Sequence, residues 1–575
     1  VVGSGNATRS YLMDVNGHLT EMPLTWYVER RRWDLSPGYT QRNDRFERPI
    51  VQGCLTCHTA TPAYSPYTQG HYTEVPLGIS CEQCHGPGSL HVEARLAGRD
   101  PEGRDATIVN PAHLERPRQL AVCQQCHLSG VEVFREGQSP ATFRPGQPLS
   151  ENRIVFVTEE QLRDPEQFGI SSHAQRLALS KCFDASAMTC TTCHDPHRSV
   201  RETGLETFSN ACRSCHNTGH PPPPEMRPAA APEEPTAPAC SIPQHNAPGV
   251  NCVSCHLQQG GTSDIPHVTF TDHWIRRRLP PRRPAGSLQE ATRTTPFRLV
   301  RVSEEAERDS LPPAEAALVQ AAATFAFYET RHTLPAYLPP VKADARRGMA
   351  GGADLAEARL ALGRVLMIED SLAAAERVFR EATARYPQHA RLLYWHGETL
   401  RRLGRPADAV APLQAAVAVQ PHFVEARVAL AGAFAEAGRF AEAETAYRAA
   451  LQENPVAYAS TWNDLGFLLL QQQRVQEAAA PLERAVHLAP DLTAALLNLG
   501  TLRLTMGQTA AAETLFGRVL SKEPDNVAAL ANRGIIAAQA GRIAEARALF
   551  RRVVTLSPGD ERAWQMLAQL EAMGR

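Results

Sequence analysis

The chain has 575 residues, a formal net charge of −2 and 21% charged residues. This length exceeds what one hydrophobic core serves, so several structural units are expected, and the balanced charge argues against a nucleic-acid-binding protein. No uninterrupted apolar run reaches the roughly 18 to 20 residues of a membrane-spanning helix.

Cysteine is confined to the first half of the chain. All 14 cysteines lie between Cys54 and Cys255, so the chain joins two chemically different parts. Twelve of them belong to six copies of one motif, C-x-x-C-H. In chain order the motifs consist of Cys54, Cys57 and His58; Cys81, Cys84 and His85; Cys123, Cys126 and His127; Cys190, Cys193 and His194; Cys212, Cys215 and His216; and Cys252, Cys255 and His256.

The spacing of this motif is typical of covalent attachment of c-type haem. Two thiols separated by two residues can form thioethers with the two vinyl groups of a porphyrin, and the following histidine can become the proximal iron ligand. Six C-x-x-C pairs could instead build three zinc ribbons, but zinc gives no reason for a histidine after every second cysteine. A thioredoxin-like redox pair needs a βαβ pattern, which is absent around these motifs. The sequence therefore predicts six c-type haems.

Residues 1–280 are predicted to form a hexahaem cytochrome c domain. Six porphyrins in this length leave few side chains for a conventional core, so we expect short helices, many loops and loss of the fold without haem. The prolines and glycines throughout 36–150 and 219–250 agree with a loop-rich domain.

Ten further histidines before residue 275 can supply distal iron ligands. The commonest role of a single histidine is on the surface or in a hydrogen bond. That role stays open above all for His18, His71, His113 and His220. The remaining candidates are His91, His173, His197, His245, His267 and His273.

Three segments resemble multihaem cytochromes c, namely GISCEQCHGPGSLH (78–91), MTCTTCHDPH (188–197) and DIPHVTFTDHWI (264–275). The superfamily they resemble includes the tetrahaem electron carrier of ammonia oxidisers, octahaem hydroxylamine oxidoreductase and pentahaem nitrite reductase. VVGSGNATRSYL at the start, WDLSPGY (33–39) and SKCF (180–183) are similar to the subgroup in which such a domain precedes tetratricopeptide repeats.

In that superfamily a histidine shortly after one motif commonly ligates the iron of a neighbouring haem. The resemblance therefore implies that His91, His197 and His273 are distal ligands and that His267 is the next candidate. His173 and His245 complete the set of six.

Two histidines on each iron would close both axial positions and favour electron transfer, because substrate chemistry needs an open position. The C-x-x-C-K motif of the pentahaem nitrite reductases does not occur in the sequence, and no tyrosine can be assigned to the cross-link of hydroxylamine oxidoreductase. We therefore expect an electron carrier rather than an enzyme and assign no catalytic residue.

Two cysteines, Cys182 and Cys240, lie outside the motifs and could form a disulfide or remain separate buried thiols. Covalent haem attachment and a disulfide would both indicate the periplasm or cell surface of a prokaryote. The first residues, VVGSGNATRS, contain no charged and apolar leader, so we expect that any signal peptide has been removed or is missing from this sequence.

Residues 281–353 are predicted to form a linker and a capping helix. The run IRRRLPPRRPAGS (275–287) is basic and rich in proline, as is typical of a linker or a solvated edge. PAEAALVQAAATFAFYE (313–329) has the composition of a helix.

From residue 354 to residue 575 the sequence repeats with a period of 34 residues. In each unit a glycine or alanine is followed by a proline 24 positions later. The pairs are Gly363 and Pro387, Gly397 and Pro421, Ala431 and Pro455, Gly466 and Pro490, Gly500 and Pro524, and Gly534 and Pro558. This is the pattern of the tetratricopeptide repeat, a helical hairpin that stacks on its neighbours, so we predict six repeats and a final helix over 560–574.

The predicted fold class is all-α: a loop-rich multihaem cytochrome c domain followed by a tetratricopeptide α-solenoid. The leading function is electron relay, with the repeats docking redox partners or assembling copies of the chain. One alternative is a haem enzyme acting on a small nitrogen or sulfur compound at a five-coordinate haem. Another is a subunit of an extracellular conductive filament.

Overall fold

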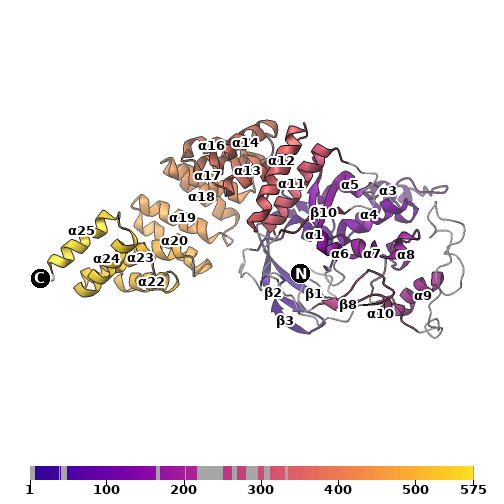
Figure 1. Ribbon diagram of the computed structural model, residues 1–575, viewed down its shortest axis with the longest axis horizontal. Helices are drawn as coiled ribbons and strands as arrows, with labels where there is room; N and C mark the ends of the chain where they lie inside the picture. Colours follow the sequence, from indigo (N-terminus) through magenta and orange to yellow (C-terminus); the bar gives the residue numbers. More distant parts are fainter. Residues whose placement is uncertain are drawn as a thin grey trace. The chain divides into compact units, whose positions relative to one another are not determined.

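The computed structural model of the chain describes residues 7–37, 39, 48–163, 169–200, 202–216, 250–261, 268–279, 296–302, 311–330, 334–456 and 458–573. The structure divides into two compact units, residues 1–382 and 383–575 (Figure 1). The six C-x-x-C-H motifs lie in the first unit, and most of the repeat region lies in the second.

The first unit contains β-strands, so the expectation of an all-α chain is wrong for this part. Its first sheet is antiparallel, in the order β1 (Thr8–Val15), β2 (His18–Tyr27) and β3 (Arg32–Leu35). The turn between β1 and β2 is Asn16-Gly17, and both residues have positive φ, 52° and 82°. Two such residues form the tight turn that fits the twist of a hairpin.

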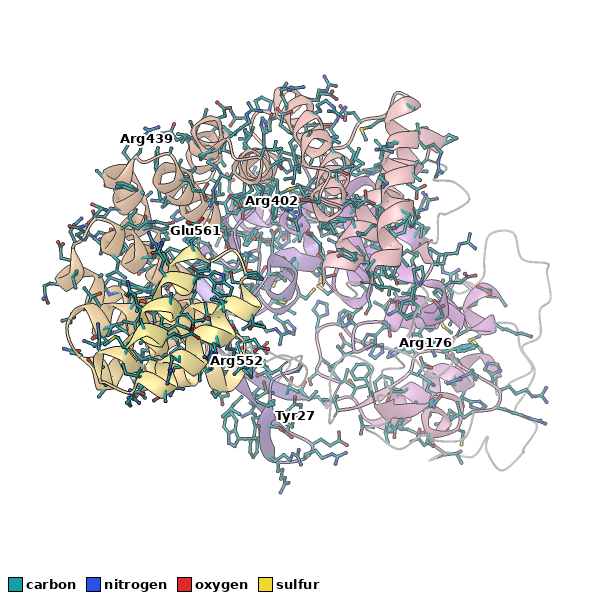
Figure 2. All side chains as sticks on the ribbon, turned by 60° about the vertical axis from the view of Figure 1, so that its left-hand side comes forward. Tyr27, Arg176, Arg402, Arg439, Arg552 and Glu561 are labelled. Carbon is teal, nitrogen blue, oxygen red and sulfur yellow. The ribbon has the colours of Figure 1, made fainter. Side chains whose placement is uncertain are left out.

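The interior face of this sheet carries hydroxyl groups that bond one another across the strands. Thr25 Oγ1 lies 2.7 Å from Ser10 Oγ and 2.7 Å from Ser36 Oγ. Tyr27 at the end of β2 is fully buried and donates its hydroxyl to the Leu35 carbonyl at 2.8 Å (Figure 2). Polar groups buried in this way cost little because they are paired.

A second antiparallel sheet has the order β10 (Leu299–Val302), β7 (Arg153–Thr158) and β6 (Val131–Phe134). Every residue of the central strand, RIVFVT, is buried. The long helix α11 (Pro313–Thr330) lies beside this sheet (Figure 1). The apolar cluster that joins sheet and helix contains Val133, Ile154, Phe156, Leu299, Val319, Ala322, Ala323, Phe327 and Tyr337.

Two small hairpins complete the described strands of the first unit. They are β4 (Ala63–Tyr64) with β5 (Tyr72–Glu74), and β8 (Gln259–Gly261) with β9 (Thr269–Thr271).

The helices around the cysteine motifs are short, as expected for a loop-rich region. They are α1 (Gln52–His58), α2 (Glu82–His85), α3 (Ser89–Leu96), α4 (Arg116–His127), α5 (Leu149–Asn152), α6 (Glu159–Arg163), α7 (His173–Leu177), α8 (Lys181–Asp184), α9 (Leu205–His216) and α10 (Cys252–His256). Single 3₁₀ turns occur at Pro111–His113, Pro140–Thr142 and Cys190–Thr192.

The end of the first unit is helical. After α11 and a 3₁₀ turn at Pro335–Tyr337 come α12 (Leu338–Ala350), α13 (Ala356–Ile368) and the start of α14 (Leu372–Arg385). A β-carbon on Gly348 would lie 2.5 Å from Leu318 Cδ2, so glycine allows α12 to approach α11 closely. The range predicted as a linker and capping helix thus contains β10, α11 and α12 among its described residues, and α11 coincides with the helix predicted over 313–329.

The second unit consists of paired helices of 13 and 14 residues that follow the predicted repeat. They are α15 (Ala390–Arg402), α16 (Pro406–Val419), α17 (Val424–Glu436), α18 (Phe440–Glu453), α19 (Ala459–Gln471), α20 (Val475–Leu488), α21 (Thr493–Thr505), α22 (Thr509–Lys522), α23 (Val527–Gln539) and α24 (Ile543–Leu556), followed by α25 (Glu561–Ala572).

The recurring small residue allows the two helices of each hairpin to pack closely. A β-carbon on Gly397 would lie 2.4 Å from Leu413 Cγ, and one on Gly500 would lie 2.7 Å from the Phe516 ring. The large side chain opposite each glycine belongs to a continuous apolar core. None of the described helices has both the length and the apolar composition needed to cross a bilayer.

Candidate haem-attachment sites

All six C-x-x-C-H motifs lie within the described residues, and each sits on a short helical turn. Helices α1, α2, α4, α9 and α10 end on the motif histidine, and the fourth motif begins on the 3₁₀ turn Cys190–Thr192. Residues three and four positions apart share one face of a helix. The two thiols and the imidazole of these motifs therefore face the same side. No disulfide joins any of the described cysteines.

The motifs of the first four sites lie next to one another. A hydrogen bond with Cys126 lowers the pKa of the Cys57 thiol, and one with Cys190 lowers the pKa of Cys123. Burial and then the charge of Cys123 raise the pKa of Cys84. The third motif therefore borders the first, the second and the fourth.

The remaining motifs continue this series. Burial, followed by the charges of Cys182 and Cys215, raises the pKa of Cys193. Burial, followed by the charges of Cys193 and Cys252, raises the pKa of Cys212 to about 12. The fourth motif therefore borders the fifth, and the fifth borders the sixth, in agreement with the contact between α9 and α10.

Two motif histidines each face a second imidazole at the spacing of a shared metal. The ring centres of His85 and His197 are 6.1 Å apart with planes inclined by 14°, and those of His194 and His273 are 6.1 Å apart with planes inclined by 23°. Metal–imidazole bonds of about 2 Å on both sides of one ion, plus about 1 Å from each nitrogen to its ring centre, give about 6 Å. Both pairs fit an iron with two histidine ligands.

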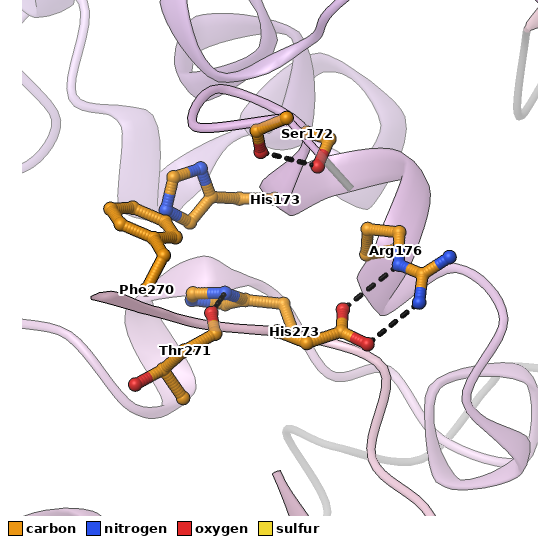
Figure 3. Close-up of a pocket in the computed structure, with 8 residues that line it drawn as sticks. Ser172, His173, Arg176, Phe270, Thr271 and His273 are labelled. Carbon is orange, nitrogen blue, oxygen red and sulfur yellow. Dashed lines mark hydrogen bonds and ion pairs between the residues drawn. The ribbon is translucent and has the colours of Figure 1, made fainter. Parts of the chain in front are cut away.

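A third contact involves His127 and His173, whose ring centres are 4.8 Å apart with nearly perpendicular planes, so this pair is closer than the spacing of about 6 Å that a shared metal requires. The His173 ring also lies 4.3 Å from the His273 ring and 4.9 Å from Phe270. His173 and His273 line one pocket together with Arg176 and Asp272 (Figure 3). The Nδ1 atom of His173 is buried and has no hydrogen-bond partner of normal geometry among the described residues.

Backbone carbonyls hold several of these rings in the orientation that a metal requires. His85 Nδ1 lies 2.8 Å from the Val109 carbonyl, His256 Nδ1 lies 2.9 Å from the Arg276 carbonyl, and His273 Nδ1 lies 3.1 Å from the Thr271 carbonyl. A ring that donates Nδ1–H in this way leaves Nε2 with its lone pair available to a metal.

Burial favours the neutral form of five histidines at or beside the motifs. It lowers the pKa of His58, His127 and His194. Burial, then the neighbouring histidines, lowers the pKa of His173 to about 2 and that of His273 to about 4. The neutral ring is the form that binds a metal, so the donor set fits haem iron.

Apolar surface surrounds the second motif. Five large side chains between residues 77 and 96 are more than half exposed in the protein alone: Leu77, Ile79, Leu90, Val92 and Leu96. A concentration of exposed apolar side chains of this kind marks a surface that something covers. A porphyrin attached at Cys81 and Cys84 has the apolar faces to do so.

The predicted distal histidines have different neighbours in the structure. The fold brings His173, His197 and His273 next to motif histidines. His91 Nδ1 lies 2.8 Å from Asp105 Oδ2, and Arg95 pairs with the same carboxylate. As for His85, this contact leaves Nε2 available to a metal. His245 and His267 lie outside the described residues, as do His220 and Cys240.

Two histidines for which a surface or hydrogen-bonding role stayed open, His18 and His71, are buried in the first unit. His18 is 3% exposed and His71 is 4% exposed, and their ring centres are 4.8 Å apart. Ser65 Oγ lies 2.6 Å from His71 Nδ1 and fixes that ring. The Asn16-Gly17 turn signal could have located His18 at the start of a strand. His113 is exposed, in agreement with a surface role.

Comparison with known proteins identifies the repeats. A family model described as "Tetratricopeptide repeat" matches residues 360–422, 396–458, 428–493 and 497–561. This part of the chain contains tetratricopeptide repeats. Such repeats form an architecture for protein–protein interaction, and the sequence prediction is confirmed on this point.

Two curated relatives match different lengths of the chain. Multiheme cytochrome MtrA of Shewanella baltica (strain OS185) is 24% identical over 209 residues, which are 32% of this chain and 61% of the relative. BBSome complex member BBS4 of Bos taurus is 29% identical over 154 residues, which are 26% of this chain and 29% of the relative. The chain thus spans less than two thirds of either relative.

Several solved structures are similar to part of this chain. The tetratricopeptide protein YrrB, with an unusual peptide-binding site, is 19% identical over 32% of this chain and 96% of its own, with a TM-score of 0.28. MamA is 23% identical over 28% of this chain and 95% of its own, with a TM-score of 0.27. A tetratricopeptide protein from Parabacteroides merdae ATCC 43184 is 14% identical over 45% of this chain and 99% of its own, with a TM-score of 0.36.

Proposed function

We propose that the chain is a multihaem c-type cytochrome that relays electrons through six covalently attached haems and binds partner proteins through its tetratricopeptide repeats. The observation that carries the proposal is the pairing of imidazoles beside the motifs, His85 with His197 and His194 with His273, each at 6.1 Å. Two such pairs, both involving a motif histidine, have no simple explanation in a fold that binds no metal.

Cysteines and histidines would hold different parts of each haem. In each motif the two thiols would anchor the porphyrin edge, and the histidine would give Nε2 to the iron. His197, His273 and His173 would supply the second axial nitrogen for the second, fourth and third haems. Bound haem would provide reversible one-electron exchange at its iron.

Ligation by histidine on both sides favours electron transfer over substrate chemistry. With both positions filled, little rearranges when the iron changes oxidation state, and no position remains for a substrate. The backbone carbonyls on His85, His256 and His273 would hold these rings in place throughout the cycle.

The order in which the motifs adjoin supports a continuous relay. The third motif borders the first, second and fourth, the fourth borders the fifth, and the fifth borders the sixth. Electrons could therefore pass along the series 1, 3, 4, 5 and 6, with the second haem as a branch at the third.

The repeats would position this relay against other proteins. Stacked helical hairpins present an extended surface that accommodates a partner protein or peptide. We propose redox partners, or further copies of this chain, as the proteins bound there. We propose that the chain acts outside the cytoplasm, in the periplasm or at the cell surface; covalent haem attachment would support this location.

Haem stoichiometry and spin state test the proposal together. The full chain, produced with a cytochrome c maturation system, should carry about six haems by pyridine haemochrome assay and show a low-spin spectrum that dithionite reduces reversibly. A colourless protein with zinc at its cysteines would overturn the proposal. A large high-spin, five-coordinate population would instead support a haem enzyme.

A further inference from the structure

An ion pair between Arg176 and Asp272 lines the same pocket as His173 and His273. The side chains are 2% and 0% exposed. Arg176 Nε donates to Asp272 Oδ1 at 2.9 Å, and Nη2 donates to Oδ2 at 2.7 Å, so the pair is bidentate (Figure 3). Such a fork fixes the angle between its partners as well as their distance.

The two partners are neighbours of two proposed axial ligands. Arg176 follows His173 by three positions in α7, so both side chains lie on the same side of that turn. Asp272 directly precedes His273. The rings of His173 and His273 are 4.3 Å apart. The ion pair and the ring contact therefore connect the same two segments at two points.

The segment from Asp272 to Arg276 is also connected to a third site. The Arg276 carbonyl accepts a hydrogen bond from His256 Nδ1 at 2.9 Å, and the Arg276 guanidinium bonds Asp272 Oδ2 at 3.2 Å. Between them, Ile275 N donates to Ser180 Oγ at 2.8 Å. One short segment thus touches ligands assigned to the third, fourth and sixth haems.

Trp274 contacts both of the guanidiniums that bind Asp272. The Arg176 guanidinium lies 5.2 Å from its ring centre and the Arg276 guanidinium 4.7 Å from it. Trp274 N also donates to Asp272 Oδ1 at 3.1 Å. The Asp272 carboxylate therefore binds the two guanidiniums that lie beside the Trp274 ring, and it also binds the Trp274 backbone.

Fold stability alone gives a weak reason for such a pair. A fully buried ion pair stabilises a fold little more than well-packed apolar residues of the same volume, because both charges lose their water. Its distinctive property is a fixed geometry. That property matters most where two irons must be held at a constant separation.

We propose that the Arg176–Asp272 ion pair is a positioning device that holds the axial histidines of the third and fourth haems, His173 and His273, as one unit and extends through Arg276 to His256 of the sixth. The inference rests on the proposed function. Arg176 and Asp272 act through the histidines and are positioning residues.

The test compares Asp272→Asn in the full haem-loaded chain with a matched control. Asn keeps the size of Asp272 but removes its charge, so both guanidiniums lose their anionic partner. The control is Glu315→Gln, which removes a partner of Arg135 in the same unit, at the start of α11, a helix that carries no motif. Electron paramagnetic resonance and a potentiometric titration report on the irons.

In Asp272→Asn, about three of the six low-spin signals should shift and the other three should coincide with those of the unaltered protein. The midpoint potentials of the shifted haems should rise, since loss of a negative charge favours the reduced iron. Arg176→Lys keeps the charge but loses the bidentate fork, so it should shift the same low-spin signals while changing the midpoint potentials less. Glu315→Gln should leave all six unchanged.

The outcomes separate the two proposals. Absence of haem from the unaltered chain overturns the proposed function. If the six haem spectra of Asp272→Asn equal those of the unaltered protein, or if only one iron changes, then only the positioning role is overturned. Should Asp272→Asn fail to fold, an experimental structure of the unaltered haem-loaded chain decides: His173 and His273 on two different irons supports the role, and either histidine unligated overturns it.

Discussion

The His197 side chain is 76% exposed, yet its ring lies 6.1 Å from the His85 ring with the planes inclined by only 14°. Its described polar contacts are local: its backbone N–H and its Nδ1 both face the Asp195 carboxylate, at 3.0 Å and 3.5 Å. An exposed ring is free to adopt many rotamers. Its alignment with His85 is therefore a feature that an iron between the two rings would explain.

Replacement of His197 by Ala should open one axial position. The chain should keep its six haems, because thioether attachment does not depend on the distal ligand, and about one sixth of the haem should become high-spin. Absorbance and electron paramagnetic resonance of the oxidised protein measure that fraction.

His113→Ala provides the matched control, since His113 is an exposed histidine on the 3₁₀ turn Pro111–His113. It should leave the spin state unchanged. A wholly low-spin spectrum in His197→Ala would remove His197 from the ligand set and return His91 to consideration for the second haem.

The candidate haem residues were predicted from the sequence because covalent attachment of haem would require a fixed spacing of thiols and histidine. The resemblance implied His91, His197 and His273, then His267, with His173 and His245 completing the set. Of these six, the structure places His173, His197 and His273 beside motif histidines. The burial of His18 and His71 could not be predicted from the sequence. It depends on a bridge between distant segments, and a single sequence carries no signal for such pairing.

At the scale of elements, the strands of the first unit show where sequence interpretation failed. The run RIVFVT in β7 is continuously apolar or β-branched after its arginine, and such a run is typical of a fully buried strand. The cysteine spacing alone predicted only helices and loops for this part of the chain. By contrast, the 34-residue period located the helical hairpins from Ala356 to Leu556, because each repeat requires the same close approach of its two helices.

That close approach predicts opposite effects for two glycine substitutions in the repeats. A β-carbon on Gly466 would lie 2.5 Å from Leu482 Cγ in the core, so Gly466→Ala should destabilise the chain by about 1–3 kcal/mol. Gly517, inside α22, has no atom within 4 Å of that position, and Gly517→Ala should stabilise it by about 0.5–1 kcal/mol. Chemical denaturation followed by far-ultraviolet circular dichroism measures both, and equal effects would contradict the packing argument.

An ion pair between neighbouring repeats predicts a pH dependence. Arg474 bonds Glu444 with Nη1 at 2.5 Å and lowers the pKa of that carboxyl below its usual value. A depressed pKa in the folded state stabilises the fold above the unfolded value of 4.5, and this stabilisation is lost as the pH falls through the folded value.

Glu444→Gln should therefore lower the free energy of unfolding by about 1 kcal/mol at pH 7, and the difference should vanish in acid. Glu571→Gln is the control. Its pair with Arg551 is exposed on both sides, and it should have little effect at any pH. Denaturant titrations at several pH values test both variants, and a difference that grows on acidification would contradict the sign.

At the scale of the whole molecule, the apolar cores are unequally distributed. The repeats share a long continuous core, and the sheet of β6, β7 and β10 has its own core with α11. Around the motifs the described clusters are small: one joins Leu19, Ile50, Leu55 and Tyr72, and another joins Leu120, Leu177 and Phe183. A region with so little apolar burial is marginal without further support.

This distribution predicts how the chain behaves when haem cannot be attached. Produced without a cytochrome c maturation system, the segments carrying the motifs should lose their fold, since porphyrins would replace the missing core. The repeats from residue 383 to residue 573 should remain helical and cooperative, because their core is complete in protein side chains alone. Limited proteolysis with mass spectrometry should then show rapid cleavage between residues 48 and 130 and protection of the repeats. Equal resistance of both regions would mean that the motif helices fold without their cofactor.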